Sequence, residues 1–196
     1  MPELLPRALC ADDALEVAPR LLGQLLVRGP VTLRITEVEA YRGPEDSAAH
    51  TSKGRTPRNA PMWGPPGHAY VYLCYGLHHM LNVVCGPEGT GHACLIRACE
   101  VLEGLDTVRA RRGGKQGPVL LTGPGKVGAA LDLDRSWSGV DLCSEGELRL
   151  CRGPTPEAML SGPRVGIDYA LPEHRDAPWR LAVAGTRWVS HRRGLR

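Results

Sequence analysis

The 196-residue sequence has no phenylalanine, only three lysines among its 24 basic residues, and only two asparagines, Asn59 and Asn82. Arginine, glycine, alanine and proline are abundant instead. We attribute this bias to the codon usage of a GC-rich genome and not to function. Because tyrosine, asparagine and lysine are disfavoured in such a sequence, the places where they do cluster carry more information than in an average chain.

Long hydrophobic runs are also missing. No run approaches the roughly 20 apolar residues of a transmembrane helix. Residues 1–13 contain acids where a signal peptide needs a basic region followed by a longer apolar stretch. We therefore expect a cytoplasmic protein with no membrane segment. Disorder of the whole chain is excluded, because 42% apolar residues are enough for a proper core.

Cysteine motifs are missing too. The seven cysteines are an odd number, are scattered, and include no CxxC, so we expect reduced thiols packed as small apolar residues. Four residues could be read as zinc ligands: Cys85, His92, Cys94 and Cys99. Their spacing fits no paired-ligand pattern, and their segment resembles a strand. Walker and Rossmann motifs are missing as well, so we predict no metal and no cofactor.

The fold class follows from composition and periodicity. The 24 glycines and 17 prolines favour short elements separated by turns. We predict helices near residues 12–25, with Asp12 or Asp13 as N-cap, 103–112 and 125–133, and strands at 31–41, 68–73, 80–85, 93–101, 148–151, 165–169 and 180–183. Residues 42–67 are predicted to form a functional loop with one short helix. No repeat or linker divides the chain, so residues 1–196 are predicted to form a single α+β domain with a mainly antiparallel, curved sheet flanked by short helices.

Charge is uneven along the chain, although the net charge is only +3. Residues 47–131 carry nine bases and four acids, whereas residues 1–46 carry five bases and eight acids. Within the middle region, five bases occur without an acid between them: Arg109, Arg111, Arg112, Lys115 and Lys126. Residues 187–196 form a basic tail. Such runs are usually solvated surface, so they support a polyanionic partner only weakly.

Tyrosine and asparagine cluster in residues 37–97, which hold four of the five tyrosines and both asparagines. Because side chains alternate along a strand, Glu37, Glu39 and Tyr41 are expected on one face, opposite Val38. A carboxylate on the inner side of a strand that leads into a long loop is a candidate general base, although a solvated carboxylate is the commoner case.

A second group of tyrosines follows on the next predicted strand. Tyr70 and Tyr72 are expected to share a face, and Tyr75 stands at a predicted tight turn before Gly76. A large aromatic side chain at a hairpin tip is poorly explained by core packing. A projecting ring suggests a partner with flat faces, such as nucleobases.

Four stretches of the sequence match consecutive motifs of one known family in the same order. They are EVEAYRGPEDSAAHTSKGRTPRNAPMWGPPGHAYVYLCYGLHHMLNVV, HACLIRACEVLEG and, more loosely, LLTGPGKVGAALDL and RVGIDYALPEHRDAPWRLAV. Together they span almost the whole chain, and several uncommon motifs in order are far more specific than one short motif. The chain resembles the alkyladenine (3-methyladenine) DNA glycosylase family.

The resemblance implies a base-excision-repair enzyme that rotates a damaged purine out of duplex DNA and hydrolyses its N-glycosidic bond. Glu39 matches the carboxylate that positions and deprotonates the attacking water, and Arg97 matches the arginine that supports it. Tyr41 and Tyr72 match the aromatic residues that sandwich the flipped base. His50 completes this pocket through its backbone or imidazole.

Other matches concern the duplex and specificity. Tyr75 matches the residue that wedges into the duplex, and Asn82 matches the asparagine that discriminates against the 2-amino group of guanine. We interpret Lys126, in GPGK at a predicted helix start, as a phosphate contact. His78 and His79 stand where vertebrate relatives carry aromatic residues, so the hairpin is expected to insert differently or to prefer different lesions.

General physical chemistry fits these roles. A stacked base cannot be attacked, so it must be extruded at a cost of a few kcal/mol. Alkylation at N3 or N7 leaves a purine cationic, and each cation–π contact with Tyr41 or Tyr72 would favour it by about 0.5–2 kcal/mol. Arg97 would keep Glu39 ionised, and an ionised Glu39 would both stabilise positive charge on the sugar and activate water.

A lyase step would require an amine nucleophile. The only lysines are Lys53, Lys115 and Lys126, and none lies in the core of the motif block. We therefore expect a monofunctional hydrolase. Its expected partner is double-stranded DNA that contains damaged purines, and we expect a monomer associated with a bacterial-type nucleoid.

Two alternatives remain open. The first is a metal-dependent nuclease or phosphodiesterase that uses Glu37, Glu39 and His50, and it predicts activity lost on chelation. The second is a non-catalytic protein that binds damaged DNA and releases no base. Formation of alkali-labile abasic sites in a lesion-containing oligonucleotide separates both from a glycosylase.

Overall fold

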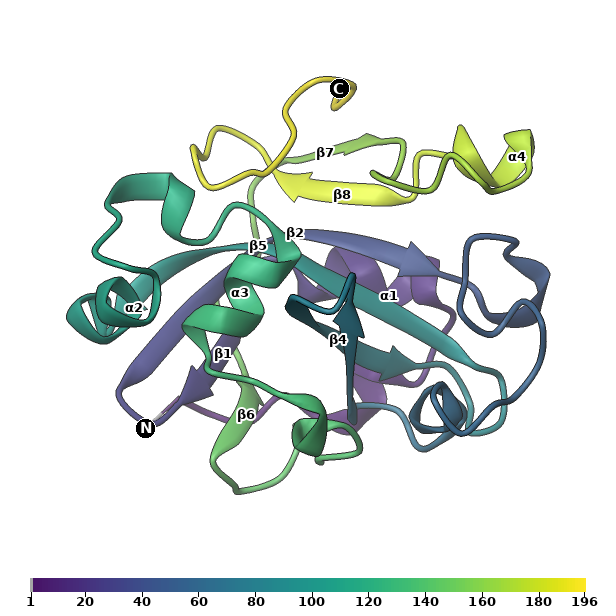
Figure 1. The fold of residues 1–196 in the computed structure, drawn as a ribbon, viewed down its shortest axis with the longest axis horizontal. Coiled ribbons are helices and arrows are strands. Elements are labelled where there is room, and N and C mark those ends of the chain that lie inside the picture. The colour runs from purple at the N-terminus through teal and green to yellow at the C-terminus, as the bar shows by residue number, and fades with distance from the viewer. Residues whose placement is uncertain (1) are drawn as a thin grey trace.

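The two longest strands, β2 (Val31–Tyr41) and β5 (His92–Glu103), pair at the centre of an antiparallel sheet. This computed structural model describes residues 2–196, and there the sheet has eight strands in the order β3-β4-β5-β2-β1-β6, with β8 paired to β2 and β7 (Figure 1). The remaining strands are β1 (Leu25–Arg28), β3 (Ala69–Cys74), β4 (His78–Cys85), β6 (Leu148–Cys151), β7 (Met159–Gly162) and β8 (Arg180–Val183). The predicted α+β class with a mainly antiparallel sheet is confirmed.

Within residues 2–196, four short α-helices flank the sheet: α1 (Ala14–Leu21), α2 (Leu105–Arg111), α3 (Pro124–Ala130) and α4 (Pro172–Arg175). Asp13 is the N-cap of α1, because its side chain accepts the Leu15 N–H at 2.9 Å. The predicted helix over 12–25 is too long at its end, because Gly23 adopts a φ of 85° and Leu25 begins β1. Figure 1 shows α2 at one edge of the molecule and α4 at the end of the β7–β8 layer.

A double irregularity in the β2–β5 pair determines which side chains face which side of the sheet. Thr36 on β2 and Arg97 on β5 both lack a partner in the ladder, so the two strands slip by one residue and then return to the same register. Each extra residue shifts the alternation of side chains by one. Ile35 therefore packs in the main core before this point and Val38 after it, while Glu39 projects from the opposite face.

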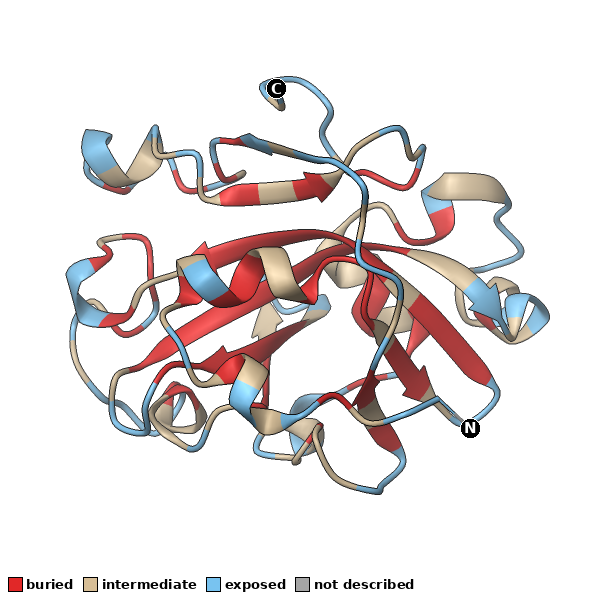
Figure 2. Ribbon diagram, turned by 180° about the vertical axis from the view of Figure 1, so that it is seen from behind, coloured by how far each residue is buried: buried red, intermediate tan, exposed pale blue. Residues whose placement is uncertain are grey.

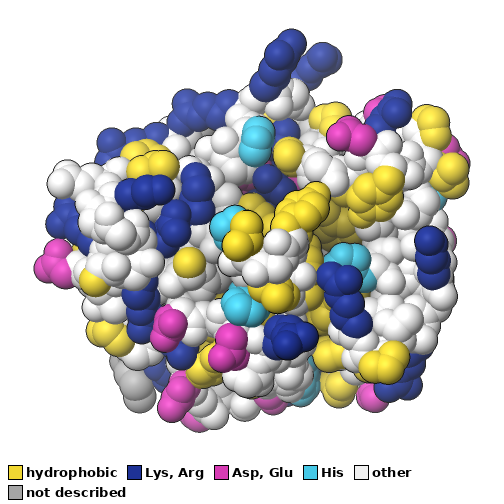
Figure 3. Space-filling view, viewed as in Figure 1, with side chains coloured by type: hydrophobic (Ala, Val, Ile, Leu, Met, Phe, Trp, Pro, Cys, Tyr) yellow, Lys and Arg dark blue, Asp and Glu magenta, His cyan; other side chains and the backbone are white. Residues whose placement is uncertain are grey.

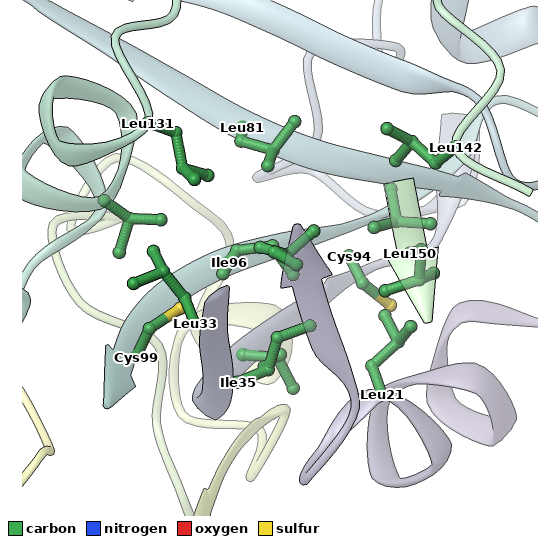
Figure 4. Packing of buried hydrophobic residues seen from close by; sticks show 14 of the residues in the cluster. Leu21, Leu33, Ile35, Leu81, Cys94, Ile96, Cys99, Leu131, Leu142 and Leu150 are labelled. Carbon is green, nitrogen blue, oxygen red and sulfur yellow. The ribbon is translucent and has the colours of Figure 1, made fainter. Parts of the chain in front are cut away.

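The sheet has a core face and a site face on β3, β4 and β5. The core face carries Ala69, Val71, Leu81, Val83, Cys94 and Ile96, which pack with buried side chains of α1 and α3. Figure 4 shows this packing, in which Leu21 comes from α1, Leu81 from β4 and Leu131 from the end of α3. Figure 2 shows that the long central strands are buried over most of their length, whereas the surrounding loops are exposed. The alternate residues of the same strands are therefore available for the site.

Several predictions of local structure are wrong. The predicted strand over 165–169 is a loop, because the Val165 N–H donates to a carboxylate and Gly166 adopts a φ of 78°. The strands β1 and β7 and the helix α4 were not predicted. Residues 42–67 contain two short 3-10 helices, Gly43–Glu45 and Ala60–Trp63, where one was predicted.

The cysteines are free thiols, and five of the seven are buried. The sulfur of Cys94 donates to the Ala14 carbonyl, and the ring of His92 accepts the Ala14 N–H, so two of the zinc candidates are engaged with the backbone. Across residues 2–196, no group of three or more His, Cys, Asp or Glu side chains is placed to hold a metal ion. In the same residues, no helix combines the length and apolar character that crossing a membrane requires.

Candidate functional site

A pocket of about 340 Å³ opens on the site face of the sheet. Seven of the eight site residues predicted from the sequence line it: Glu39, Tyr41, His50, Tyr72, Tyr75, Asn82 and Arg97. The lining also includes residues to which the sequence assigned no role, notably Arg58, Tyr70, Val165 and Tyr169. A volume of this size, with aromatic walls and a few polar groups, is typical of a site for a small molecule or a single base.

The β3–β4 hairpin supplies one wall of the pocket. The strand register sets Tyr70 opposite Asn82, and the rings of Tyr70 and Tyr72 stack with their centroids 5.6 Å apart. The Asn82 side-chain amide donates to the Tyr70 carbonyl at 3.1 Å, which fixes its orientation. Burial raises the pKa of Tyr70 to about 12 and also raises the pKa of Tyr72, so both phenols are neutral at physiological pH.

Glu39 is completely buried and is surrounded by donors. Its Oε1 accepts the Val165 N–H at 2.7 Å and lies 3.3 Å from Arg97 Nη1, and its Oε2 accepts the Tyr41 hydroxyl at 2.9 Å. Burial, together with the Glu39 charge, raises the pKa of Tyr41 well above its usual range, so this phenol keeps the proton that it donates. The carboxylate is thus held in one orientation beside the pocket, with a cation next to it.

Arg97 is buried between two carboxylates. Burial by itself would lower its pKa, but the charges of Glu39 and Glu37 outweigh this effect and the pKa is raised. Its Nε lies 3.5 Å from Glu37 Oε1 on the side away from Glu39. A permanent positive charge therefore borders the Glu39 carboxylate.

His50 reaches the pocket from the long loop after β2. Asn59 anchors this loop, because its side-chain amide donates to the His50 carbonyl at 2.8 Å. The His50 ring contacts Tyr72 edge-on, with centroids 4.5 Å apart, and its Nδ1 lies 2.9 Å from the Tyr70 hydroxyl. Desolvation within the pocket, together with the Arg58 charge, lowers the pKa of His50. A neutral imidazole at physiological pH adds no positive charge to the pocket.

Tyr75 stands at the tip of the β3–β4 hairpin and is 90% exposed. It adopts a φ of 50° and is followed by Gly76 at 69°, so the predicted tight turn is confirmed. A left-handed conformation is uncommon for a tyrosine, and it directs a large ring out of the fold. Leu77 beside it is also exposed. The hairpin tip is therefore an apolar projection at the mouth of the pocket.

The loop over 164–170 forms another part of the lining, and the sequence predicted a strand for most of it. Val165 binds Glu39, and the Tyr169 hydroxyl donates to the Ala48 carbonyl at 3.0 Å. Arg164 forms a completely buried ion pair with Asp46, with N···O distances of 2.5 and 2.9 Å. The only sequence signal for this loop was the family resemblance of RVGIDY.

Lys126 is the one predicted site residue that does not line the pocket. It lies on α3, where partial burial and the charges of Arg112 and Lys115 lower its pKa. Figure 3 shows Lys and Arg side chains gathered over the α2 side and over the C-terminal segment, next to a central group of hydrophobic and histidine side chains. Basic side chains therefore lie on the same face of the molecule as this central group.

Comparison with known proteins shows which family this chain belongs to. Residues 8–187 match the family model described as methylpurine-DNA glycosylase. A DNA-3-methyladenine glycosylase of Arabidopsis thaliana is 58% identical over 96% of this chain and 74% of its own length. Two further relatives are provisionally named 3-methyladenine DNA glycosylases. The protein of Nitrosococcus oceani is 60% identical over 100% of this chain and 97% of its own length. The protein of Streptomyces avermitilis is 44% identical over 95% of this chain and 90% of its own length. The chain belongs to the methylpurine-DNA glycosylase family.

Proposed function

We propose that this protein is a monomeric, monofunctional DNA glycosylase that flips alkylated or deaminated purines out of double-stranded DNA and hydrolyses their N-glycosidic bond. The observation that carries the proposal is the Glu39 carboxylate, held between Arg97 and the Tyr41 hydroxyl beside an aromatic pocket. The names of the relatives support the same substrate class.

Recognition depends on the neutral aromatic walls. A purine alkylated at N3 or N7 is cationic and gains cation–π attraction from Tyr41 and Tyr72, whereas a normal base gains less. The neutral His50 ring does not repel this cation. Asn82, whose amide is fixed by the Tyr70 carbonyl, excludes the 2-amino group of guanine by its bulk in that wall.

Chemistry depends on Glu39. As the bond between C1′ and the purine nitrogen breaks, the purine takes the bonding electron pair and positive charge develops on the sugar, which the carboxylate stabilises. Glu39 accepts one proton from a water molecule whose oxygen bonds to C1′. Arg97 orients the carboxylate. The three lysines, all within the described residues, lie outside the pocket lining, so no amine is available there for a lyase step.

The carboxylates that a metal-dependent nuclease would use, Glu37 and Glu39, are poorly suited to bind a metal ion. The oxygens of Glu37 already accept from Ser190 and Arg180, and those of Glu39 accept from Val165 and Tyr41. The Arg97 guanidinium lies between the two carboxylates and would repel a divalent cation. These contacts favour hydrolysis by a carboxylate and water.

The test is base release. Duplex oligonucleotides that carry one hypoxanthine or one 1,N6-ethenoadenine are incubated with the protein with and without EDTA, and then treated with alkali. We expect alkali-labile sites in both conditions and no strand cleavage before alkali. Loss of activity with EDTA would favour the nuclease, and tight binding without base release would favour the non-catalytic reader.

Replacement of the wedge is expected to weaken lesion binding without affecting the fold. Stacking of one aromatic side chain on a base is worth about 1–3 kcal/mol, so Tyr75→Ala is expected to raise the Kd for a lesion-containing duplex about tenfold or more. Because Tyr75 is exposed, the thermal midpoint of unfolding stays unchanged. Fluorescence anisotropy at fixed salt measures the effect. Met159→Ala, another exposed apolar residue, is the control, and equal affinities of both variants and wild type would contradict the wedge assignment.

Lys126 is expected to contact a DNA phosphate. Loss of one such contact makes the slope of log K against log salt concentration less steep by about 0.9. The affinity of Lys126→Ala is therefore expected to be lower than that of wild type at low salt and to approach it as the salt concentration rises. This applies to both lesion-containing and undamaged duplexes. Arg152→Ala, which removes a base paired with Glu3, serves as control and should leave the slope unchanged. An unchanged slope in Lys126→Ala would remove Lys126 from the interface.

A further inference from the structure

A buried charge cluster lies behind Glu39 and Arg97 and does not line the pocket. Its anion is Glu37, completely buried, and its cation is Arg180, only 2% exposed, with an N···O distance of 3.0 Å. Two further hydrogen bonds to Glu37 come from Ser190, from its N–H at 2.6 Å and from its hydroxyl at 3.0 Å. Because Glu37 has no access to the pocket, it cannot touch a substrate and acts only through its neighbours.

Ser190 belongs to the basic tail over 187–196, which the sequence assigned to the protein surface. Arg180 fastens this tail by donating to the carbonyl of His191 at 2.6 Å and to that of Arg193 at 3.3 Å. The tail therefore does more than present exposed arginines. Its backbone is fixed to β8, and one of its side chains enters the charge cluster.

The Ser190 hydroxyl joins the two halves of the cluster. It accepts hydrogen bonds from Arg97 Nε at 3.4 Å and Nη2 at 3.2 Å while donating to Glu37. Arg97 Nη1 is thereby left to face Glu39. Without the hydroxyl, Arg97 Nη2 would lose its contact at 3.2 Å and Nε would keep only the Glu37 oxygen at 3.5 Å, so the guanidinium could tilt between its two carboxylate partners.

We propose that Ser190, with Glu37, is a positioning residue for the reaction: it holds Arg97 in the orientation that aligns the Glu39 carboxylate. This inference rests on the proposed glycosylase function and deepens it, because it makes the C-terminal segment part of the catalytic support. A displacement of about 1 Å in a positioning group can lower a rate about 100-fold, so a single hydroxyl remote from the substrate is sufficient to matter.

The test separates chemistry from binding. We expect Ser190→Ala to lower the single-turnover rate of hypoxanthine or ethenoadenine excision by about 10- to 100-fold at saturating enzyme. The Kd for the lesion-containing duplex should stay within about twofold, because the pocket walls are untouched. Ser190→Thr, which restores the hydroxyl, should recover most of the rate. A role in stability alone would not produce this split or this rescue.

Two controls make each outcome decisive. Ser138→Ala removes a hydroxyl that accepts the Val71 N–H outside the cluster, and it should leave the rate unchanged. Ser190→Cys replaces the hydroxyl with a thiol, which is slightly larger and a weaker donor and acceptor, and it serves as the second variant if the alanine variant unfolds. A wild-type rate in the folded Ala or Cys variant, or equal losses of rate and affinity, would overturn the positioning role. No excision by the wild-type protein on any lesion would instead overturn the proposed function, and the positioning role with it.

Discussion

Glu39→Gln is expected to lower the single-turnover rate of lesion excision by about 1,000-fold or more, while affinity for the lesion-containing duplex is retained. General base catalysis contributes about 10²- to 10⁴-fold, and the same carboxylate also stabilises charge on the sugar. Both effects depend on the negative charge of Glu39, which the amide lacks. The pocket walls that bind the base remain in place.

The hydrogen-bond pattern around Glu39 makes this substitution structurally mild. The amide oxygen of glutamine can keep the Val165 N–H and the contact with Arg97, while its NH₂ group faces the Tyr41 hydroxyl. A hydroxyl can rotate to accept as well as donate, so no donor is forced against another donor. The loss is therefore chemical, and the variant should remain folded.

Matched measurements complete this test. Single-turnover excision and anisotropy binding are carried out on wild type, Glu39→Gln and Glu100→Gln. Glu100 lies on the same strand as Arg97 and pairs with Arg34, but it does not line the pocket, so its variant should keep the wild-type rate. Undiminished turnover by Glu39→Gln would remove Glu39 from the proposed role.

Local patterns were sufficient for much of the fold. The strand over 31–41, with alternating polar and apolar residues, is found with the predicted bounds, and the strands over 148–151 and 180–183 are also confirmed. Alternation correctly set Glu39 and Tyr41 on one face. Which face they share depended on a count that began at Glu37, beyond the first register shift, since a count from Val31 would have put both residues on the core face.

Contacts between distant residues could not be predicted in this way. The partner of Glu39 is the backbone of Val165, 126 positions later, and the partner of Glu37 is Ser190, 153 positions later. Such a pairing depends on how β8 and the C-terminal segment fold back onto β2, which no local periodicity encodes. The segment over 165–169 has the apolar spacing of a strand, but its backbone is used to hold a carboxylate, and tertiary context outweighed propensity there.

Arg164→Met is expected to lower the free energy of unfolding by about 3–5 kcal/mol, because it leaves the completely buried Asp46 carboxylate without its cation. The arginine also donates to the Ala40 carbonyl at 2.9 Å, and its guanidinium lies over the Tyr41 ring at 4.6 Å. Removal of Arg164 therefore also loosens one wall of the pocket. Methionine keeps most of the side-chain volume, so the expected loss reflects charge and hydrogen bonds more than a cavity.

Urea unfolding measures this loss, and two variants show where it comes from. Asp46→Asn combined with Arg164→Met removes both charges, so it should recover part of the stability lost in the single variant. Arg175→Met breaks a solvent-exposed pair with Asp176 and should leave the unfolding midpoint unchanged. A single Arg164→Met variant as stable as wild type would mean that the Asp46 carboxylate is satisfied by its backbone donors, the N–H groups of Arg42 and Ala48, alone. The loop over 164–170 would then be held to the pocket by Val165 and Tyr169, and its attachment would not depend on the buried ion pair.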